Sequence, residues 1–102
     1  MDAMTKFYIL DGHEAVPVAN LDEWAKRADL THRHVGDTMI GAVRVSTVFL
    51  GINHNHFGGP PLLFETMVFG GPLNDEQQRY STWAEAEAGH AAMVARLQAT
   101  IN

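Results

Sequence analysis

Two closely spaced pairs of histidines are the residues of this sequence whose type and spacing point most directly to chemistry. The pairs are His32-Arg33-His34 and His54-Asn55-His56. In an extended strand, residues i and i+2 project to the same side, so either pair could chelate one metal ion. A third ligand could come from His13, Glu65 or His90.

The surroundings of these histidines argue against a metal site. A His-x-His pair ahead of a glutamate resembles the first motif of cupins, but eight residues separate His56 from Glu65, which is longer than the cupin spacing. The second cupin motif, with its additional histidine, is missing. His54 and His56 also lie in a loop of glycine and asparagine rather than in a rigid strand. We therefore expect no bound metal and predict that these histidines, with the adjacent Phe57, form hydrogen bonds or contact a ligand.

The sequence contains no known catalytic motif, so we expect a protein that is not an enzyme and uses no cofactor. It has no cysteine, which excludes disulfides, thiolate zinc sites and cysteine nucleophiles. Ser46 and Ser81 lack the flanking glycines of a nucleophile elbow. Glu65 is the only carboxylate in the strongest strand pair, so acid–base catalysis by paired carboxylates is disfavoured. His90 lies on the apolar stripe of the last predicted helix, where a histidine usually fills a core or an interface.

A binding site for a nucleotide-like ligand fits the remaining polar and aromatic residues better. Arginines can hold a phosphate with two hydrogen bonds, aromatic rings can stack on a base, and the glycines at 58 and 59 would let the histidine loop pass close to a ligand. Arg44 and Glu65 could be neighbours on one sheet face, either as a structural ion pair or as part of a pocket. The candidate ligand-binding residues are Arg44, His54, His56, Phe57, Glu65, Phe69, Arg79, Tyr80, Trp83 and Arg96.

Composition and charge set limits on the class of protein. The 102 residues suffice for a single domain, residues 1–102, with a modest core. No apolar stretch approaches the ~18 residues that a membrane span requires, and the N-terminus lacks a signal-peptide pattern, so we expect a cytoplasmic protein without a membrane partner. The net charge of −5 argues against non-specific nucleic-acid binding, which depends on Lys and Arg neutralising phosphates.

Hydrophobic periodicity predicts an α+β fold, with an antiparallel sheet of four to five strands, a short N-terminal helix and a longer C-terminal helix. The predicted strands cover 6–10, 14–18, 31–40, 43–50 and 62–69, with a hairpin turn at Gly41-Ala42. The predicted helices cover 21–29, capped by Asn20, and 83–100, capped by Thr82. Between the last strand and the last helix we expect only a polar linker.

The central strands carry apolar residues on both sides, as strands that are covered on both faces do. One face is expected to hold Ile40, Val43, Val45, Thr47 and Phe49, and the other Arg33, Val35, Asp37, Arg44, Ser46, Val48 and Leu50. The two helices can pack across one face but cannot cover both. Self-association into a homo-oligomer would cover the second face, and the alternative is that the loop 51–61 folds over it.

The central and C-terminal segments also resemble a known group of proteins. The run VSTVFLG, GPPLLFETMVFGG and RYSTWAEAEAGH resembles small proteins encoded by bacteriophages and prophages, and it is similar to the Thoeris anti-defence family, type one. The resemblance covers residues 43–94, about half of the chain, and the N-terminal third does not align. The residues that it carries over as ligand contacts are Arg44, Phe69 and Arg96.

The resemblance implies a function. Proteins of that family are of similar size, form oligomers and sequester cyclic ADP-ribose signals of bacterial immune enzymes without degrading them, and some hold cyclic di- or trinucleotides in a separate pocket. We therefore expect a homo-oligomeric protein of the bacterial host cytoplasm that sequesters a nucleotide-derived immune signal. The alternative is a protein that inhibits a host defence nuclease or CRISPR effector by binding to it.

Overall fold

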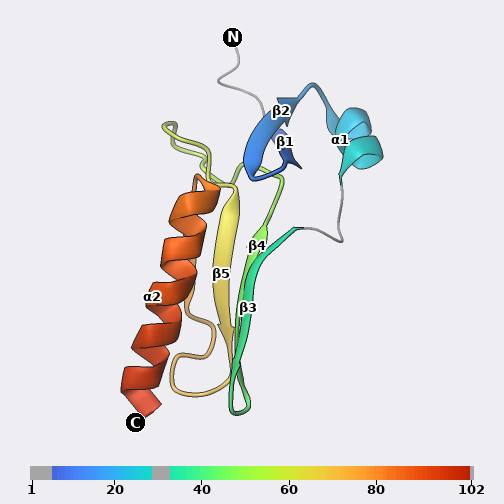
Figure 1. Cartoon of the computed structure of the whole chain (residues 1–102). Coiled ribbons are helices and arrows are strands. Elements are labelled where there is room, and N and C mark those ends of the chain that lie inside the picture. The colour runs from blue at the N-terminus through green and yellow to red at the C-terminus, as the bar shows by residue number, and fades with distance from the viewer. Residues whose placement is uncertain (1–5, 29–32, 102) are drawn as a thin grey trace.

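Two antiparallel sheets and two helices make up the parts of the chain that the computed structural model describes, residues 6–28 and 33–101 (Figure 1). The elements are β1 (Phe7–Asp11), β2 (Glu14–Val18), α1 (Leu21–Arg27), β3 (His34–Ile40), β4 (Val43–Phe49), β5 (Phe64–Phe69), β6 (Gln77–Tyr80) and α2 (Trp83–Ile101). The α+β class is confirmed, with a short N-terminal helix and a longer C-terminal one.

The larger sheet is a four-stranded meander with the order β3-β4-β5-β6. Its first hairpin turns at Gly41-Ala42 as predicted, so Ile40 lies opposite Val43. The edge strand β6 was not predicted, because Gln77 to Tyr80 are mostly polar and show no apolar alternation. The expected polar linker is therefore wrong over these residues, which pair with β5 from Phe64↔Tyr80 to Met67↔Gln77.

A β-bulge in β3 changes which side chains face the core. His34 lies opposite Val48, but Gly36 lies opposite Thr47, so Val35 is an extra residue in the strand. Val35 therefore packs against the core cluster around Phe49. Arg33 also differs from expectation, because its carbonyl accepts a hydrogen bond from Phe49 N at 2.8 Å and its side chain lines a cavity with Phe49. The predicted positions of Arg33 and Val35 on the opposite face are wrong for this reason.

Helix α2 covers one face of the larger sheet (Figure 1). It begins with the predicted capping box, in which Glu85 N donates to Thr82 Oγ1 at 3.1 Å and Thr82 N donates to the Glu85 carboxylate at 3.1 Å. Beneath it lie two apolar clusters: Val43, Val45, Val68, Met93 and Leu97 in one, and Phe49, Leu63, Phe64 and Ala86 in the other. Within the described residues, no helix is long and apolar enough to cross a membrane.

The hairpin of β1 and β2 forms a separate two-stranded sheet beyond the upper end of the larger one (Figure 1). It is joined to the larger sheet by a hydrogen bond from Tyr8 N to Gly51 O at 2.8 Å and by the bridge Phe7↔Ile52. Helix α1 packs against this hairpin through the rings of Phe7 and Trp24, whose centroids are 6.3 Å apart. The expectation that both helices share one face of a single sheet is therefore wrong.

The second face of the larger sheet, called the open face below, is formed by the side chains that point away from α2. These are His34, Asp37, Met39, Arg44, Ser46, Val48, Glu65, Met67, Phe69, Gln77 and Arg79. Met39 and Phe69 on this face are 60% and 45% exposed. The loop 51–61 leads into the start of β5, whereas Phe69 lies at the end of that strand, so the loop does not shield these two side chains.

Candidate functional site

The predicted ligand-binding residues do not form one site. Arg44 and Glu65 share the open face but are not neighbours, because Arg44 lies opposite Phe69, whereas Glu65 lies opposite Val48. The pair Ser46↔Met67 separates them along the strands. The predicted contact between Arg44 and Glu65 is therefore wrong, although Arg44 and Phe69 are brought side by side.

Each predicted arginine is already paired with a carboxylate. Arg44 donates from Nε and Nη2 to the two oxygens of Asp37, both at 2.9 Å. Arg79 pairs with Glu65 at 3.0 Å, and Arg96 pairs with Glu76. The Arg44 guanidinium hydrogen-bonded to Asp37 holds the pKa of that carboxyl below its ordinary value. These guanidinium groups would have to leave their partners before they could hold a phosphate.

The asparagines of the histidine loop hold its backbone in place through hydrogen bonds. Asn53 Oδ1 accepts hydrogen bonds from Asn55 N and Leu62 N, and Asn55 Nδ2 donates to the carbonyl of Pro60. Phe57 projects from this loop and is 98% exposed. Over residues 6–28 and 33–101, no three His, Asp or Glu side chains are grouped as a metal site requires, and His32 lies outside these residues.

A chain of hydrogen bonds crosses the core between the two apolar clusters. Tyr80 OH donates to Thr66 Oγ1 at 3.2 Å, and Thr66 Oγ1 bonds to Thr47 Oγ1. Thr47 Oγ1 then contacts His90 Nδ1 at 2.7 Å, and His90 Nε2 contacts Thr38 Oγ1 at 2.8 Å. With a neutral imidazole protonated on Nε2, each hydroxyl from Tyr80 to Thr47 can donate to the next acceptor.

This chain of hydrogen bonds, called the buried polar layer below, includes His90 and Tyr80, two residues that the sequence analysis considered. Burial lowers the pKa of His90, which favours the neutral imidazole. His90 thus lies in the core with both ring nitrogens hydrogen-bonded, as its position on the apolar stripe predicted. Tyr80 is a member of the same layer, and with Arg96 it also lines a cavity beside α2.

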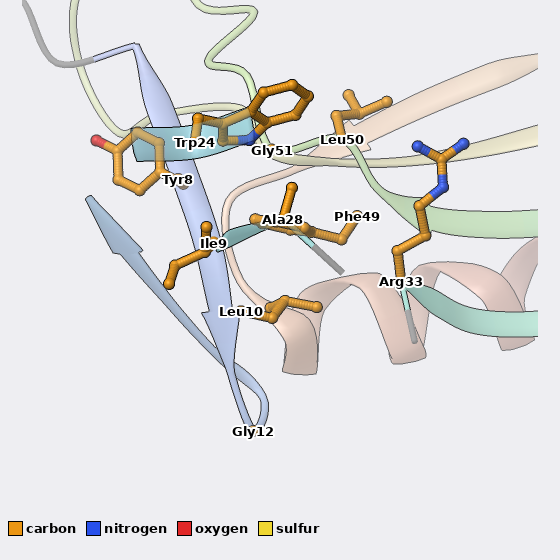
Figure 2. Close-up of a pocket in the computed structure, with 10 residues that line it drawn as sticks. All are labelled: Tyr8, Ile9, Leu10, Gly12, Trp24, Ala28, Arg33, Phe49, Leu50 and Gly51. Atoms are coloured by element: carbon orange, nitrogen blue, oxygen red, sulfur yellow. The ribbon is translucent and has the colours of Figure 1, made fainter. Parts of the chain in front are cut away.

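One pocket lies at the junction of the hairpin, α1 and β4 (Figure 2). Its lining is the one that best suits a ligand with both a ring and a negative charge. It has a volume of about 220 Å³ and is lined by Tyr8, Ile9, Leu10, Gly12, Trp24, Ala28, Arg33, Phe49, Leu50 and Gly51. Figure 2 shows the rings of Tyr8 and Trp24 on one side and the guanidinium of Arg33 on the other. We call this the Arg33 pocket.

The electrostatics of the Arg33 pocket favour a negative charge. Arg33 is the one charged side chain among the described residues that line it. A guanidinium beside apolar walls can bind a phosphate or carboxylate through paired hydrogen bonds. Aromatic rings on the facing wall offer a stacking surface for a flat heterocycle.

Gly51 allows the walls of this pocket to come together. Its φ is +78°, and a Cβ atom there would lie 2.8 Å from Trp24 Nε1 and 3.2 Å from the carbonyl oxygen of Tyr8. Only glycine combines this backbone conformation with so close an approach. Gly51 therefore links the end of β4 to Tyr8 and Trp24.

The sequence interpretation missed the residues of the Arg33 pocket. Trp24 was assigned only to the apolar face of a helix, and Arg33 was placed on the wrong face of its strand. A usable signal existed in Tyr8, Trp24 and Arg33 as a set, because two rings and an arginine suit the ligand class that was expected. Nothing in the sequence pattern, however, indicates that the N-terminal hairpin packs against the end of β4.

Comparisons with known proteins give no further assignment. No protein-family model matches the chain, and no curated protein and no solved structure gives a significant match.

Proposed function

We propose that this protein sequesters a nucleotide-derived immune signal, such as a cyclic ADP-ribose isomer or a cyclic oligonucleotide, in the bacterial cytoplasm without degrading it. The observation that carries the proposal is the Arg33 pocket, in which the guanidinium of Arg33 and the aromatic residues Tyr8, Trp24 and Phe49 border a common cavity. This combination matches a ligand built from a flat base and a phosphate. The resemblance of residues 43–94 to the Thoeris anti-defence family supports the same ligand class.

The size of the pocket suggests how the ligand would be held. A volume of about 220 Å³ is smaller than the ~300–1,000 Å³ typical of pockets for drug-sized ligands. One chain therefore has room for about one nucleobase-sized group. The rest of a cyclic dinucleotide would extend beyond it, which supports binding by an assembly rather than by a single protomer.

The open face is the proposed surface for this assembly. The Met39 and Phe69 side chains lie there on either side of Arg44, which pairs with Asp37, and the Glu65–Arg79 ion pair lies further along the strands, beyond Ser46 and Met67. Exposed apolar residues together with paired charges are typical of protein–protein contact surfaces. Two copies facing one another would bury Met39 and Phe69 together with the Asp37–Arg44 pair between them.

Isothermal titration with cyclic ADP-ribose isomers and cyclic dinucleotides tests the ligand. Arg33→Ala is expected to weaken binding by at least about tenfold, since a hydrogen bond to a charged group contributes ~1.5–3 kcal/mol. Arg96→Ala is the matched control, because Arg96 lies on α2, where it pairs with Glu76, outside both the pocket and the open face. If none of these ligands released or absorbed heat on titration, the proposal would be refuted.

A second experiment separates capture from degradation. Mass spectrometry of small molecules released from protein that was expressed together with an active immune synthase is expected to recover the signal chemically intact. Recovery of hydrolysed products alone would assign an enzymatic role instead.

The open face also supports the second candidate function, a protein that inhibits a host defence nuclease or CRISPR effector. The specific observation is the exposure of Met39 and Phe69, which would suit a foreign protein as well as a second copy. Such a protein would co-purify with a host partner at a fixed ratio and would give no heat with nucleotides.

A further inference from the structure

We propose that a second cleft, between the β1–β2 turn and the start of α2, binds a small planar organic cation bearing a guanidinium group. The cleft has a volume of about 720 Å³ and is lined by residues of the hairpin, of the segment before β5 and of the first turn of α2. It adjoins the Arg33 pocket, since Tyr8 lines both. The proposal does not depend on the function proposed above.

The charges of this cleft are opposite to those of the Arg33 pocket. Asp11, Glu14 and Glu87 contribute carboxylates, and the described lining contains neither lysine nor arginine. Carboxylates around a concave apolar wall concentrate negative potential, which attracts cations and repels phosphates. A nucleotide is therefore the wrong ligand for this cleft.

The wall of the cleft is aromatic. Trp83 and Phe64 meet edge to face with their centroids 6.2 Å apart, and Phe64 is fully buried beneath the indole. Cations bind favourably over the face of a tryptophan, and a guanidinium also stacks flat on such a ring. The combination of an indole face and nearby carboxylates thus offers a guanidinium both a stacking surface and hydrogen-bond acceptors.

His13 shows that the indole accepts a flat nitrogen-bearing group. Its imidazole is stacked on Trp83 with the centroids 3.8 Å apart and the planes inclined by 5°. His13 is exposed and follows Gly12, which has a φ of +63°, at the tip of the hairpin. A guanidinium has the same planar shape and adds a fork of donors that carboxylates can accept. The ligand is therefore proposed to displace His13 and to take its place over the indole.

A separate observation concerns the polar edge of the same ring. Trp83 Nε1 is buried and has no hydrogen-bond partner. Unsatisfied buried donors are rare in proteins. A ligand that carries a carbonyl group beside its guanidinium could satisfy this donor once His13 has moved.

The test uses Nα-acetyl-arginine amide as the probe and Nα-acetyl-citrulline amide as its neutral counterpart of nearly the same shape. Binding is followed by the indole N–H resonances of a ¹⁵N-labelled protein, which separate Trp83 in the cleft from Trp24 in the Arg33 pocket. The arginine compound is expected to shift the Trp83 resonance saturably and to leave Trp24 unchanged, with the citrulline compound binding at least about tenfold more weakly. Equal affinity for the two compounds, or no saturable shift of Trp83, would overturn the proposal.

Variants test the separate parts of the site. Glu14→Gln combined with Glu87→Gln is expected to weaken binding of the arginine compound by about tenfold or more, whereas Glu23→Gln on α1 leaves it unchanged. His13→Ala is expected to tighten binding, because the competing imidazole is gone. If the double variant bound the arginine compound with unchanged affinity, the proposed role of the carboxylates would be overturned. If His13→Ala bound it more weakly, the proposal that the ligand displaces His13 would be overturned. Because the two tryptophans report on different pockets, failure here is distinguishable from failure of nucleotide binding.

Discussion

The hydroxyl of Tyr80 lies 2.2 Å from the place that a Cβ atom at position 89 would occupy. Gly89 is an interior residue of α2, where glycine costs the helix ~1 kcal/mol relative to alanine. Gly36 in β3 has the same relationship to His90, whose ring would lie 2.9 Å from a Cβ there. Two glycines that serve no turn thus make space for the two rings of the buried polar layer.

Gly89→Ala is expected to destabilise the protein despite the better helix propensity of alanine. The added methyl group would push Tyr80 away from Thr66 Oγ1, and overpacking of a core typically costs ~1–3 kcal/mol. Chemical denaturation should therefore show a net loss of up to about 2 kcal/mol in the free energy of unfolding. In a Tyr80→Ala background the same substitution should be neutral or stabilising. A more stable Gly89→Ala protein with Tyr80 intact would contradict the packing described here.

Thr47→Val tests the centre of the hydrogen-bond chain. Valine keeps the shape of threonine but leaves His90 Nδ1 and Thr66 Oγ1 without this partner, and an unsatisfied buried polar group costs ~1–3 kcal/mol. The unfolding free energy should fall by about that amount, as measured by urea denaturation. Thr100→Val on the exposed end of α2 is the control, with an expected change within about 0.5 kcal/mol.

Protonation of His90 is expected to weaken the fold in mild acid. Because burial lowers its pKa in the folded protein, the unfolded chain binds the proton more readily below the ordinary pKa of 6.5. The stability from the neutral imidazole is complete above pH 6.5 and decreases as the pH falls from there toward the lowered folded pKa. His90→Gln, which keeps a donor and an acceptor but cannot titrate, should show a shallower decrease in denaturation midpoint over this range. Parallel curves for the two proteins would argue that other groups cause the acid sensitivity.

Gly51→Ala and Gly41→Ala form a matched pair of substitutions. Both glycines have positive φ, +78° and +59°, so alanine strains the backbone by ~1 kcal/mol at either position. At Gly41 nothing lies within 4 Å of the added Cβ, whereas at Gly51 the Trp24 indole is 2.8 Å away. Thermal unfolding should therefore show the larger loss for Gly51→Ala, which alone should also weaken nucleotide binding. Equal losses would mean that Gly51 is required only for its backbone conformation.

Phe69→Ser is expected to weaken self-association through the open face. Loss of this exposed ring removes apolar area from the proposed contact, so sedimentation velocity should show a shift toward the protomer. Phe57→Ser is the control, since Phe57 is the most exposed aromatic side chain named above but lies in the loop 51–61. A wild-type chain that sediments as a protomer at micromolar concentration would exclude the proposed assembly.

The parts of the fold that the sequence predicts are those with a strong local signal. Runs with apolar residues on both sides of the strand identified β4 and β5, and the capping residues Asn20 and Thr82 fixed the starts of both helices, as the hydrogen bonds from Glu23 N and Glu85 N now show. The face of β4 that carries Val45, Thr47 and Phe49 also followed from the two-residue period. These features depend on neighbouring residues, so tertiary contacts did not have to be known.

The parts that could not be predicted depend on long-range placement. Strand β6 is polar and forms because β5 offers it a hydrogen-bonding edge. The types of the residues Gln77 to Tyr80 do not themselves predict this pairing. The Arg33 pocket draws residues from β1, α1 and β4, so its existence depends on where the N-terminal hairpin docks. For the candidate site, the residue types in the sequence indicated a class of ligand, but the sequence did not show which of these residues lie together.

The extra residue in β3 has a consequence for the distribution of charge over the molecule. Were the strand regular, Val35 would lie opposite Val48 and Arg33 opposite Leu50, so the Arg33 side chain would emerge on the open face instead of beside Tyr8 and Trp24. The cavity would then have no cation, and the surface proposed for assembly would gain one. The extra residue in this edge strand thus determines whether the arginine that can attract an anion lies in the Arg33 pocket or on the open face.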